Sequence, residues 1–359
     1  MLFRNACGAV VRTAIAASLT LLTACVADLA DEPLDEAEIL DEAVEALSQG
    51  VGSTAARAAL ALRWAPIHYQ DVDVTGSHAL GGRSDYISRV DFDGDWIATN
   101  NWENTPNHPL RAHAYHNVVE TSSHWYIIYT FFHPRDWADN VFETEHENDA
   151  EGVLVIVGRD GSTYGRLLGA VTVAHKDFFS FVPTGSPFTG KNESVDGTLR
   201  LASHDGHDHP ITAQEAKGHG LKAWPSYDIV GDGVKYYPSL TTAEEPMSAY
   251  DDDVRYKLID AYGPEGFWPR RQLASLFASH GTFAGDKGGG CGLLPHLCTT
   301  NAANAPWGWD DKDDGPVLRG EIATDPAKLT AHYFNVPSGF SSSYTFNPFQ
   351  NIGADPNTP

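Results

Sequence analysis

The sequence is poor in cysteine and in basic residues. Its 359 residues include four cysteines, and 24 lysines and arginines stand against 48 aspartates and glutamates, for a formal net charge of −24. The phosphate backbone of a nucleic acid repels such a chain, so we expect no nucleic-acid partner. The sequence also lacks a Gly-x-Ser-x-Gly elbow, a phosphate-binding loop and a dinucleotide fingerprint, which argues against three common enzyme classes. A cationic ligand or a metal ion suits this charge better.

Long apolar runs are also scarce, and the clearest one lies near the start, at residues 14–24. It follows Arg4 and Arg12, is too short to span a membrane as a helix, and ends with Leu-Thr-Ala-Cys at residues 22–25. This ending resembles the lipobox of bacterial lipoproteins. We therefore expect residues 1–24 to be a signal peptide and Cys25 to be acylated. An ordinary signal peptide or a non-bacterial membrane anchor is the alternative.

The segment after Cys25 is strongly acidic and has no basic residue through position 50. Like charges repel, so we expect residues 25–54 to form an extended tether, with a short amphipathic helix as the alternative. Val26 is not the aspartate that retains lipoproteins at the inner membrane, which favours the outer membrane or the cell surface. The folded domain is expected over residues 55–359.

Two cysteines remain in the expected domain, Cys291 and Cys298. In an oxidising compartment, a close pair of this kind is most simply a disulfide that closes a loop rich in glycine and proline. A zinc site that also uses His296 is the alternative, but the second half of a zinc ligand set is missing.

The pattern of the expected domain is mainly β. Short aromatic or β-branched runs alternate with clusters of Gly, Pro, Asn and Asp, which predicts a β-sandwich with helical and loop insertions. Strands are expected at residues 125–132, 153–157, 167–174 and 211–216. Helices are expected at Asp252–Tyr262 and Gln272–His280, and a third from Asp325, with Pro326 at its first position.

One constellation carries metal-binding chemistry. Asp149 and Glu151 are two residues apart, directly before an apolar strand, so both side chains should point to the same face. His146 precedes them, and a hairpin would bring Asp136 alongside. Three carboxylates and an imidazole in one place repel one another without a cation. Mostly oxygen ligands favour magnesium, calcium or manganese, and solvated loop charges are the alternative.

The same stretch resembles the signature of necrosis-inducing toxin-like proteins. Residues 132–136 read Phe-His-Pro-Arg-Asp and resemble the family's Tyr-Phe-Pro-Lys-Asp; residues 145–151 read Glu-His-Glu-Asn-Asp-Ala-Glu and resemble Gly-His-Arg-His-Asp-Trp-Glu. The resemblance implies a β-sandwich and a divalent metal held by four residues, Asp136, His146, Asp149 and Glu151. Glu145, Glu147, Asn148 and Ala150 depart from the family pattern, which puts toxin activity in doubt.

Further stretches resemble a related family named for a fungal vacuolar protein sorting-associated protein (number 62). They begin with Leu-Arg-Trp-Ala-Pro-Ile-His-Tyr at residues 62–69 and end with Ala-Pro-Trp-Gly-Trp at residues 305–309. Between them lie the similar segments 84–87, 101–104, 209–219 and 224–225. The resemblance therefore spans roughly residues 60–320 and implies one shared fold.

Two histidines that follow expected strands, His175 and His219, are candidates for lining the metal cavity. Satisfied surface histidines are the alternative reading for both. We expect the protein to bind a polar lipid headgroup or a glycan, because the resembling toxins bind sphingolipid headgroups. A metal-dependent hydrolase of a phosphate or glycosidic bond, with one of these histidines as base, is the alternative. A purely structural metal is a third possibility.

Overall fold

The computed structural model describes residues 36–139, 144–227, 229, 233–285, 297–298, 303–312 and 317–351. The expected signal peptide, Cys25 and Cys291 lie outside the described residues, as does the side chain of Cys298. The lipid anchor and the disulfide therefore stay predictions. Within the described ranges, no helix combines the length and apolar character that a membrane span requires.

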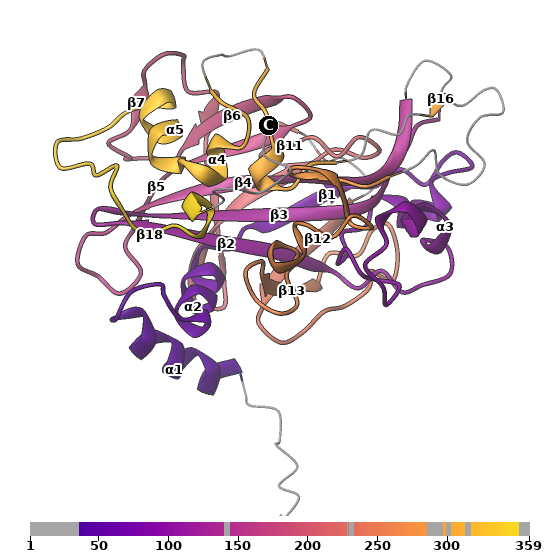
Figure 1. Ribbon diagram of the computed structural model, residues 1–359, viewed down its shortest axis with the longest axis horizontal. Helices are drawn as coiled ribbons and strands as arrows, with labels where there is room; N and C mark the ends of the chain where they lie inside the picture. Colours follow the sequence, from indigo (N-terminus) through magenta and orange to yellow (C-terminus); the bar gives the residue numbers. More distant parts are fainter. Residues whose placement is uncertain are drawn as a thin grey trace, which may run out of the picture. The chain divides into compact units, whose positions relative to one another are not determined.

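The fold is mainly β, as predicted, and is built on one large mixed sheet (Figure 1). Along the sheet the strands are β11 (Leu221–Ala223), β10 (His207–Gln214), β1 (Ile67–Asp71), β12 (Gly233–Ser239), β13 (Val254–Asp260), β2 (His113–Thr121), β3 (His124–Asp136), β4 (Thr144–Gly158), β5 (Arg166–Ala174), β6 (Asp177–Val182) and β8 (Gly197–Thr198). Three strands attach beside this path: β9 (Leu201–His204), β16 (Leu297–Cys298) and β18 (Tyr344–Phe346).

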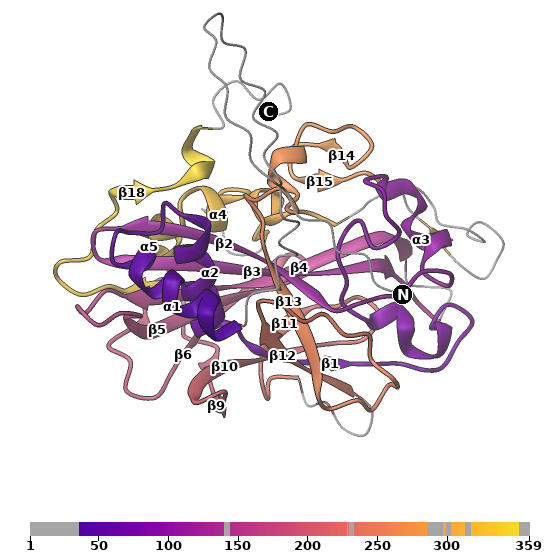
Figure 2. The same ribbon diagram turned by 90° about the horizontal axis from the view of Figure 1, so that it is seen from below.

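The sheet curls on itself, so that strands far apart in its order face each other. Strand β11, at one end, contacts β5 and β4 near the other end, and in Figure 2 the strands β10, β11 and β12 lie below β3 and β4. The result is sandwich-like, with an apolar layer between the two halves. This layering places the start of β4 next to the loop that joins β10 to β11.

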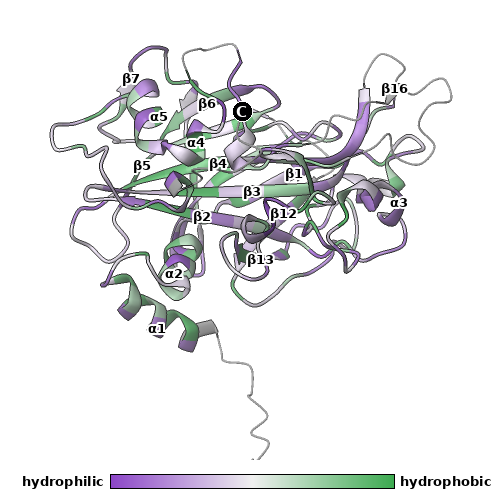
Figure 3. Cartoon of the chain, in the orientation of Figure 1, coloured by the Kyte–Doolittle hydropathy of each residue, from purple (hydrophilic) through white to green (hydrophobic). Residues whose placement is uncertain are grey.

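Residues 153–157 of β4 are buried on both faces, which explains their continuous apolar sequence. Val153, Val155 and Val157 point into the layer between the two halves of the sheet. Leu154 and Ile156 point into a second core on the opposite face. In Figure 3, green runs along much of β3 and the adjoining part of β4, whereas the end of β4 near β16 is purple.

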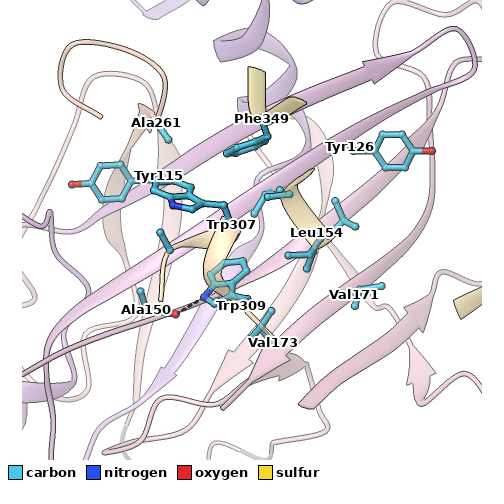
Figure 4. Packing of buried hydrophobic residues seen from close by; sticks show 14 of the residues in the cluster. Tyr115, Tyr126, Ala150, Leu154, Val171, Val173, Ala261, Trp307, Trp309 and Phe349 are labelled. Atoms are coloured by element: carbon cyan, nitrogen blue, oxygen red, sulfur yellow. Dashed lines mark hydrogen bonds between the residues drawn. The ribbon is translucent and has the colours of Figure 1, made fainter. Parts of the chain in front are cut away.

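The second core is closed by aromatic side chains from the C-terminal third of the chain. Trp268, Trp307 and Phe349 pack edge to face or tilted, with ring centroids 4.7–6.0 Å apart. Trp307 and Trp309 lie against β4 in Figure 4. The short elements around these rings are η3 (Trp268–Arg270), η4 (Pro306–Gly308), α4 (Glu321–Thr324), α5 (Pro326–Tyr333) and η5 (Pro348–Asn351).

Two N-terminal helices pack on the sheet, α1 (Glu36–Leu47) and α2 (Thr54–Trp64). Arg57 of α2 donates two hydrogen bonds to Asp260 at the end of β13, at 2.7 and 2.9 Å, and both side chains are buried. Helix α1 packs against α2. The compact unit begins at residue 35, so the helical alternative, and not an extended chain, describes residues 36–47.

Two predicted helices are wrong. Asp252–Tyr262 contains strand β13, because pairing with β12 and β2 on either side outweighs the local helical pattern. Gln272–His280 holds turns and strand β14 (Phe277–Ser279), which pairs with β15 (Thr282–Phe283). The helix from Asp325 is confirmed as α5, with the Asp325 carboxylate accepting from the Lys328 N–H. The remaining elements are α3 (Asn101–Asn104), η1 (Leu80–Asp85), η2 (Ala98–Asn100), β7 (Thr189–Gly190) and β17 (Phe334–Asn335).

Candidate metal and ligand site

The four predicted metal ligands line one cavity of about 750 Å³. Strands β3 and β4 form a hairpin in which Asp136 lies opposite His146, and Glu151 lies opposite Phe131. The prediction that a hairpin brings Asp136 beside His146 therefore agrees with the structure. Asp149 and Glu151 are both buried at the start of the apolar part of β4, on its cavity side.

The ring orientation of His146 is set by the backbone. Its Nδ1 atom lies 3.0 Å from the carbonyl oxygens of Glu147 and Asn148. A carbonyl oxygen only accepts, so Nδ1 carries the proton. In the neutral ring Nε2 then holds a lone pair, and it lies 3.3 Å from Asp136 Oδ2. Two such groups repel unless a proton or a cation comes between them, and metal-bound histidines commonly have this backbone support.

Asp149 is held by His219, one of the two candidate histidines. His219 Nδ1 lies 3.0 Å from Asp149 Oδ2, and its Nε2 lies 3.3 Å from Asp85 Oδ1. Although burial alone would lower the pKa of His219, the two carboxylates raise it to about 9. The ring also stacks on His133 with centroids 3.8 Å apart. His219 is fully buried, so it supports the cavity from beneath and is not among the residues that line it.

Asp85 completes this support and was not predicted as a site residue. Its fully buried carboxylate accepts hydrogen bonds from Trp137 Nε1 at 2.7 Å, from the Lys217 N–H at 2.9 Å and from the Asp73 N–H at 2.8 Å. The carboxylate therefore joins the end of β3 to the loop that carries His219. The Ser-Asp-Tyr-Ile motif around it was the available sequence signal.

Glu151 is fixed by two backbone donors. The His175 N–H donates to Oε1 at 2.5 Å, and the Leu221 N–H donates to Oε2 at 3.2 Å. Burial nevertheless raises the pKa of Glu151 well above its ordinary value, and Asp149 adds to the shift. Burial also raises the pKa of Asp136 to about 6. A divalent cation would relieve the cost of keeping these buried carboxylates ionised.

His175, the other candidate histidine, lines the cavity at its edge. It is the first residue of the two-residue turn between β5 and β6 and has a φ of 59°, which is unusual for a residue other than glycine. Its Nε2 lies 2.6 Å from Glu215 Oε1, and this hydrogen bond raises the pKa of His175. A Cβ atom at Gly220 would lie 3.1 Å from His175 Nε2 and 2.7 Å from Glu215 Oε1. The glycine therefore leaves room for His175 and Glu215 to form their hydrogen bond.

Two of the residues that depart from the toxin-like pattern, Glu145 and Asn148, anchor neighbouring segments. Glu145 is buried, and its Oε1 accepts from the Ala138 N–H at 3.0 Å and lies 2.7 Å from His78 Nδ1. Asn148, at a φ of 60°, donates to the carbonyl oxygens of Ala98 and Ala284. These side chains therefore hold loops in place and do not line the cavity.

The lining of the cavity also includes cations that were not predicted. Lys176, Lys312 and Arg319 line the cavity together with Trp309 and Asn304. The Arg319 guanidinium donates to Gly308 O, Thr282 Oγ1 and Asn304 Oδ1, which are all uncharged. Trp309 donates from Nε1 to the Ala150 carbonyl at 2.9 Å (Figure 4). We call these three cations the cationic wall, although the acidic Asp310 lines the cavity beside them, and we call Asp136, Asp149 and Glu151 the carboxylate wall.

The side chains as they stand are paired with one another. Within the part of the chain that the structure describes, no group of three or more His, Cys, Asp or Glu side chains is placed to hold a metal ion. Asp136 pairs with His146 and Asp149 with His219. The residues fit a divalent ion in donor type and in sharing one cavity, and binding through all four would require side chains to turn out of these pairs.

No protein-family model matches the chain, and no curated protein matches it. Among solved structures it is similar to the non-toxic HaNLP3 protein, with 15% identity, 55% of this chain and 73% of that chain covered, and a TM-score of 0.27. It is also similar to necrosis and ethylene inducing protein 2 from the causal agent of cocoa's witches' broom disease, with 12% identity, 62% of this chain and 82% of that chain covered, and a TM-score of 0.30. A third similar structure is NLPPya in complex with glucosamine, with 15% identity, 55% of this chain and 71% of that chain covered, and a TM-score of 0.26. All three are necrosis-inducing toxin-like proteins, and the similarity of this chain to them is low.

Proposed function

We propose that the domain binds one divalent cation through Asp136, His146, Asp149 and Glu151, and that this ion helps to bind a polar lipid headgroup or a glycan. The observation that carries the proposal is the single cavity that all four side chains line. The supporting details are the His146 ring, whose Nε2 faces a carboxylate, and the raised pKa values of Asp136 and Glu151. Magnesium, calcium and manganese suit this oxygen-rich set.

The cationic wall supports a ligand that carries a negative group. Lys176, Lys312 and Arg319 face the cavity, and none of them has a carboxylate partner among the described residues. Hydroxyl groups would be bound by the ion and by carboxylate oxygens, while a phosphate or an acidic sugar would lie against the cations. Trp309 offers an indole surface to a sugar ring.

We test this proposal by calorimetric titration of the metal-loaded protein with glucosamine, glucosamine 6-phosphate and myo-inositol 1-phosphate. We expect a phosphorylated probe to bind at a site that is present in the metal-loaded protein and is lost on treatment with chelator. Lys312→Gln should weaken this binding by about tenfold, the effect of losing one charge-assisted contact. The matched control is Lys235→Gln, which removes an equal charge outside the cavity and should have no effect. Absence of binding by every probe to the metal-loaded wild type would contradict the ligand class.

The second candidate, a metal-dependent hydrolase, is favoured by the His175–Glu215 pair. A carboxylate on Nε2 orients the ring and leaves Nδ1 as the other nitrogen, 3.8 Å from Glu151 Oε1. In such an enzyme His175 would move a proton at Nδ1, and the metal would activate water. His175→Ala should then abolish turnover of a phosphodiester or glycoside while the metal affinity stays within about twofold. If the wild type binds the metal but turns over no substrate, the hydrolase is rejected and the binding function is the one that remains.

We also propose that Cys25 anchors the mature protein to the bacterial envelope through acyl chains, at the outer membrane or the cell surface. The lipobox-like ending of residues 22–25 supports this. The test is metabolic labelling with radioactive palmitate, followed by fractionation. We expect label on the wild type and none on Cys25→Ala, and an unlabelled wild type would contradict the anchor.

A further inference from the structure

A second cavity, remote in sequence from the metal ligands, is lined by basic side chains. It has a volume of about 400 Å³ and shares no lining residue with the metal cavity. Arg89, Arg111, His113 and Lys257 contribute to its wall, and no acidic residue is among the residues that line it. The chain has twice as many acidic as basic residues. A cavity lined by several basic and no acidic side chains is therefore not expected from a random mixture of its charges.

The fold brings these side chains close together. His113 begins β2 and lies opposite Lys257 of the neighbouring parallel strand β13. Arg89 is held in place by a two-pronged contact with Asp91, at 2.8 and 2.9 Å. Arg111 is exposed, and its guanidinium has no hydrogen-bond or ion-pair partner among the residues that the structure describes. The N–H donors of the Arg111 guanidinium are therefore available to a ligand.

The positive charge in this cavity is only partly balanced. Lys257 Nζ lies 3.7 Å from Glu265, a long and exposed contact. Asp91 pairs with Arg89 and Glu265 with Lys257, so the charge of Arg111 is in excess. Burial lowers the pKa of His113 to about 4, and the charges of Arg89 and Lys257 add smaller contributions in the same direction. An anion bound here would offset a repulsion that the fold already contains.

We propose that this cavity is an anion-binding site for a phosphate or sulfate group carried on an apolar or ring-shaped body. Arginine forks match the oxygens of such a group, and lysine adds a point charge. Phe92 and Pro109 supply an apolar wall for the attached body. We name this set of residues, Arg89, Phe92, Pro109, Arg111, His113 and Lys257, the basic pocket.

The test is calorimetric titration of the chelator-stripped protein with inorganic phosphate and with phenyl phosphate. Chelator removes metal from the first cavity, so the result does not depend on the proposed function. We expect phenyl phosphate to bind more tightly than phosphate because of the apolar wall. Arg111→Gln and Lys257→Gln should each weaken binding by about tenfold or more. Arg111 has no partner to lose, so its replacement should leave the fold intact, which circular dichroism would verify.

Two further variants complete the design. Lys235→Gln controls for the loss of one charge, and Arg319→Gln reports on the cationic wall of the metal cavity; both should bind as the wild type does. Three results would overturn the proposal: no binding by the wild type, unchanged binding by a folded Arg111→Gln variant, or binding that is lost in Arg319→Gln and kept in Arg111→Gln.

Discussion

Replacement of Asp85 by asparagine tests the support beneath the metal cavity. The carboxylate accepts two N–H groups on Oδ1, from Trp137 and Lys217, and one on Oδ2, from Asp73. An asparagine that keeps its oxygen toward Trp137 turns an NH2 group toward the Asp73 N–H, and an unsatisfied buried donor costs about 1–3 kcal/mol. The two remaining bonds each weaken by about 1 kcal/mol, because a neutral acceptor replaces a charged one. We therefore expect Asp85→Asn to lower the free energy of unfolding by about 3–5 kcal/mol.

The assay is urea unfolding of the metal-free protein, followed by tryptophan fluorescence. The midpoint should fall without a change in the slope of free energy against urea concentration. The matched control is Asp253→Asn, which removes the same charge from an exposed side chain and should change stability by less than about 0.5 kcal/mol. If Asp85→Asn cost no more than this control, the carboxylate would not hold the loop that carries His219.

Three further changes have defined outcomes. Gly152→Ala should destabilise the domain by about 1–3 kcal/mol or more in a urea melt, because its Cβ would lie 2.0 Å from a carbonyl oxygen of the neighbouring strand. The control is Gly52→Ala, whose Cβ would meet no atom within 4 Å. Equal destabilisation by the two variants would refute the packing argument. The folded pKa of His219, about 9, lies above its ordinary value, so its contribution to stability should be full below about pH 6.5 and lost as the pH rises toward 9. In metal-free protein, His219→Gln should flatten this decline, and an unchanged pH profile would argue against the ion pairs. Glu215→Gln should lower the pKa of His175, measured by NMR titration, because the hydrogen bond to the carboxylate raises it; an unshifted titration would show that the pair does not form in solution.

Local sequence patterns predicted four strands of the sheet and the hairpin of the site, because aromatic and β-branched runs bounded by turn residues are recognisable within a few neighbouring residues. The i, i+2 spacing of Asp149 and Glu151 placed both on one face of β4, and the capping aspartate at Asp325 marked helix α5. The segment 252–262 was misassigned since its strand character comes from neighbours that lie far away in sequence.

Two residues that shape the site, Asp85 and Arg319, were not predicted from the sequence. Asp85 contacts a loop more than one hundred residues away, and Arg319 reaches the cavity from the C-terminal third of the chain. Such contacts depend on how the sheet curls, which no local period encodes. The role of Glu145 and Asn148 as anchors of other loops likewise becomes visible only when those loops are packed.

The central claim is that the carboxylate wall binds a divalent ion. Its most direct test is calorimetric titration of the chelator-stripped chain with calcium, magnesium and manganese, beside Asp149→Ala and the exposed control Asp253→Ala. We predict one ion per chain for the wild type and for Asp253→Ala, and no binding by Asp149→Ala. If the wild type binds none of the three ions, or if Asp149→Ala binds as well as the wild type, the cavity is not a metal site.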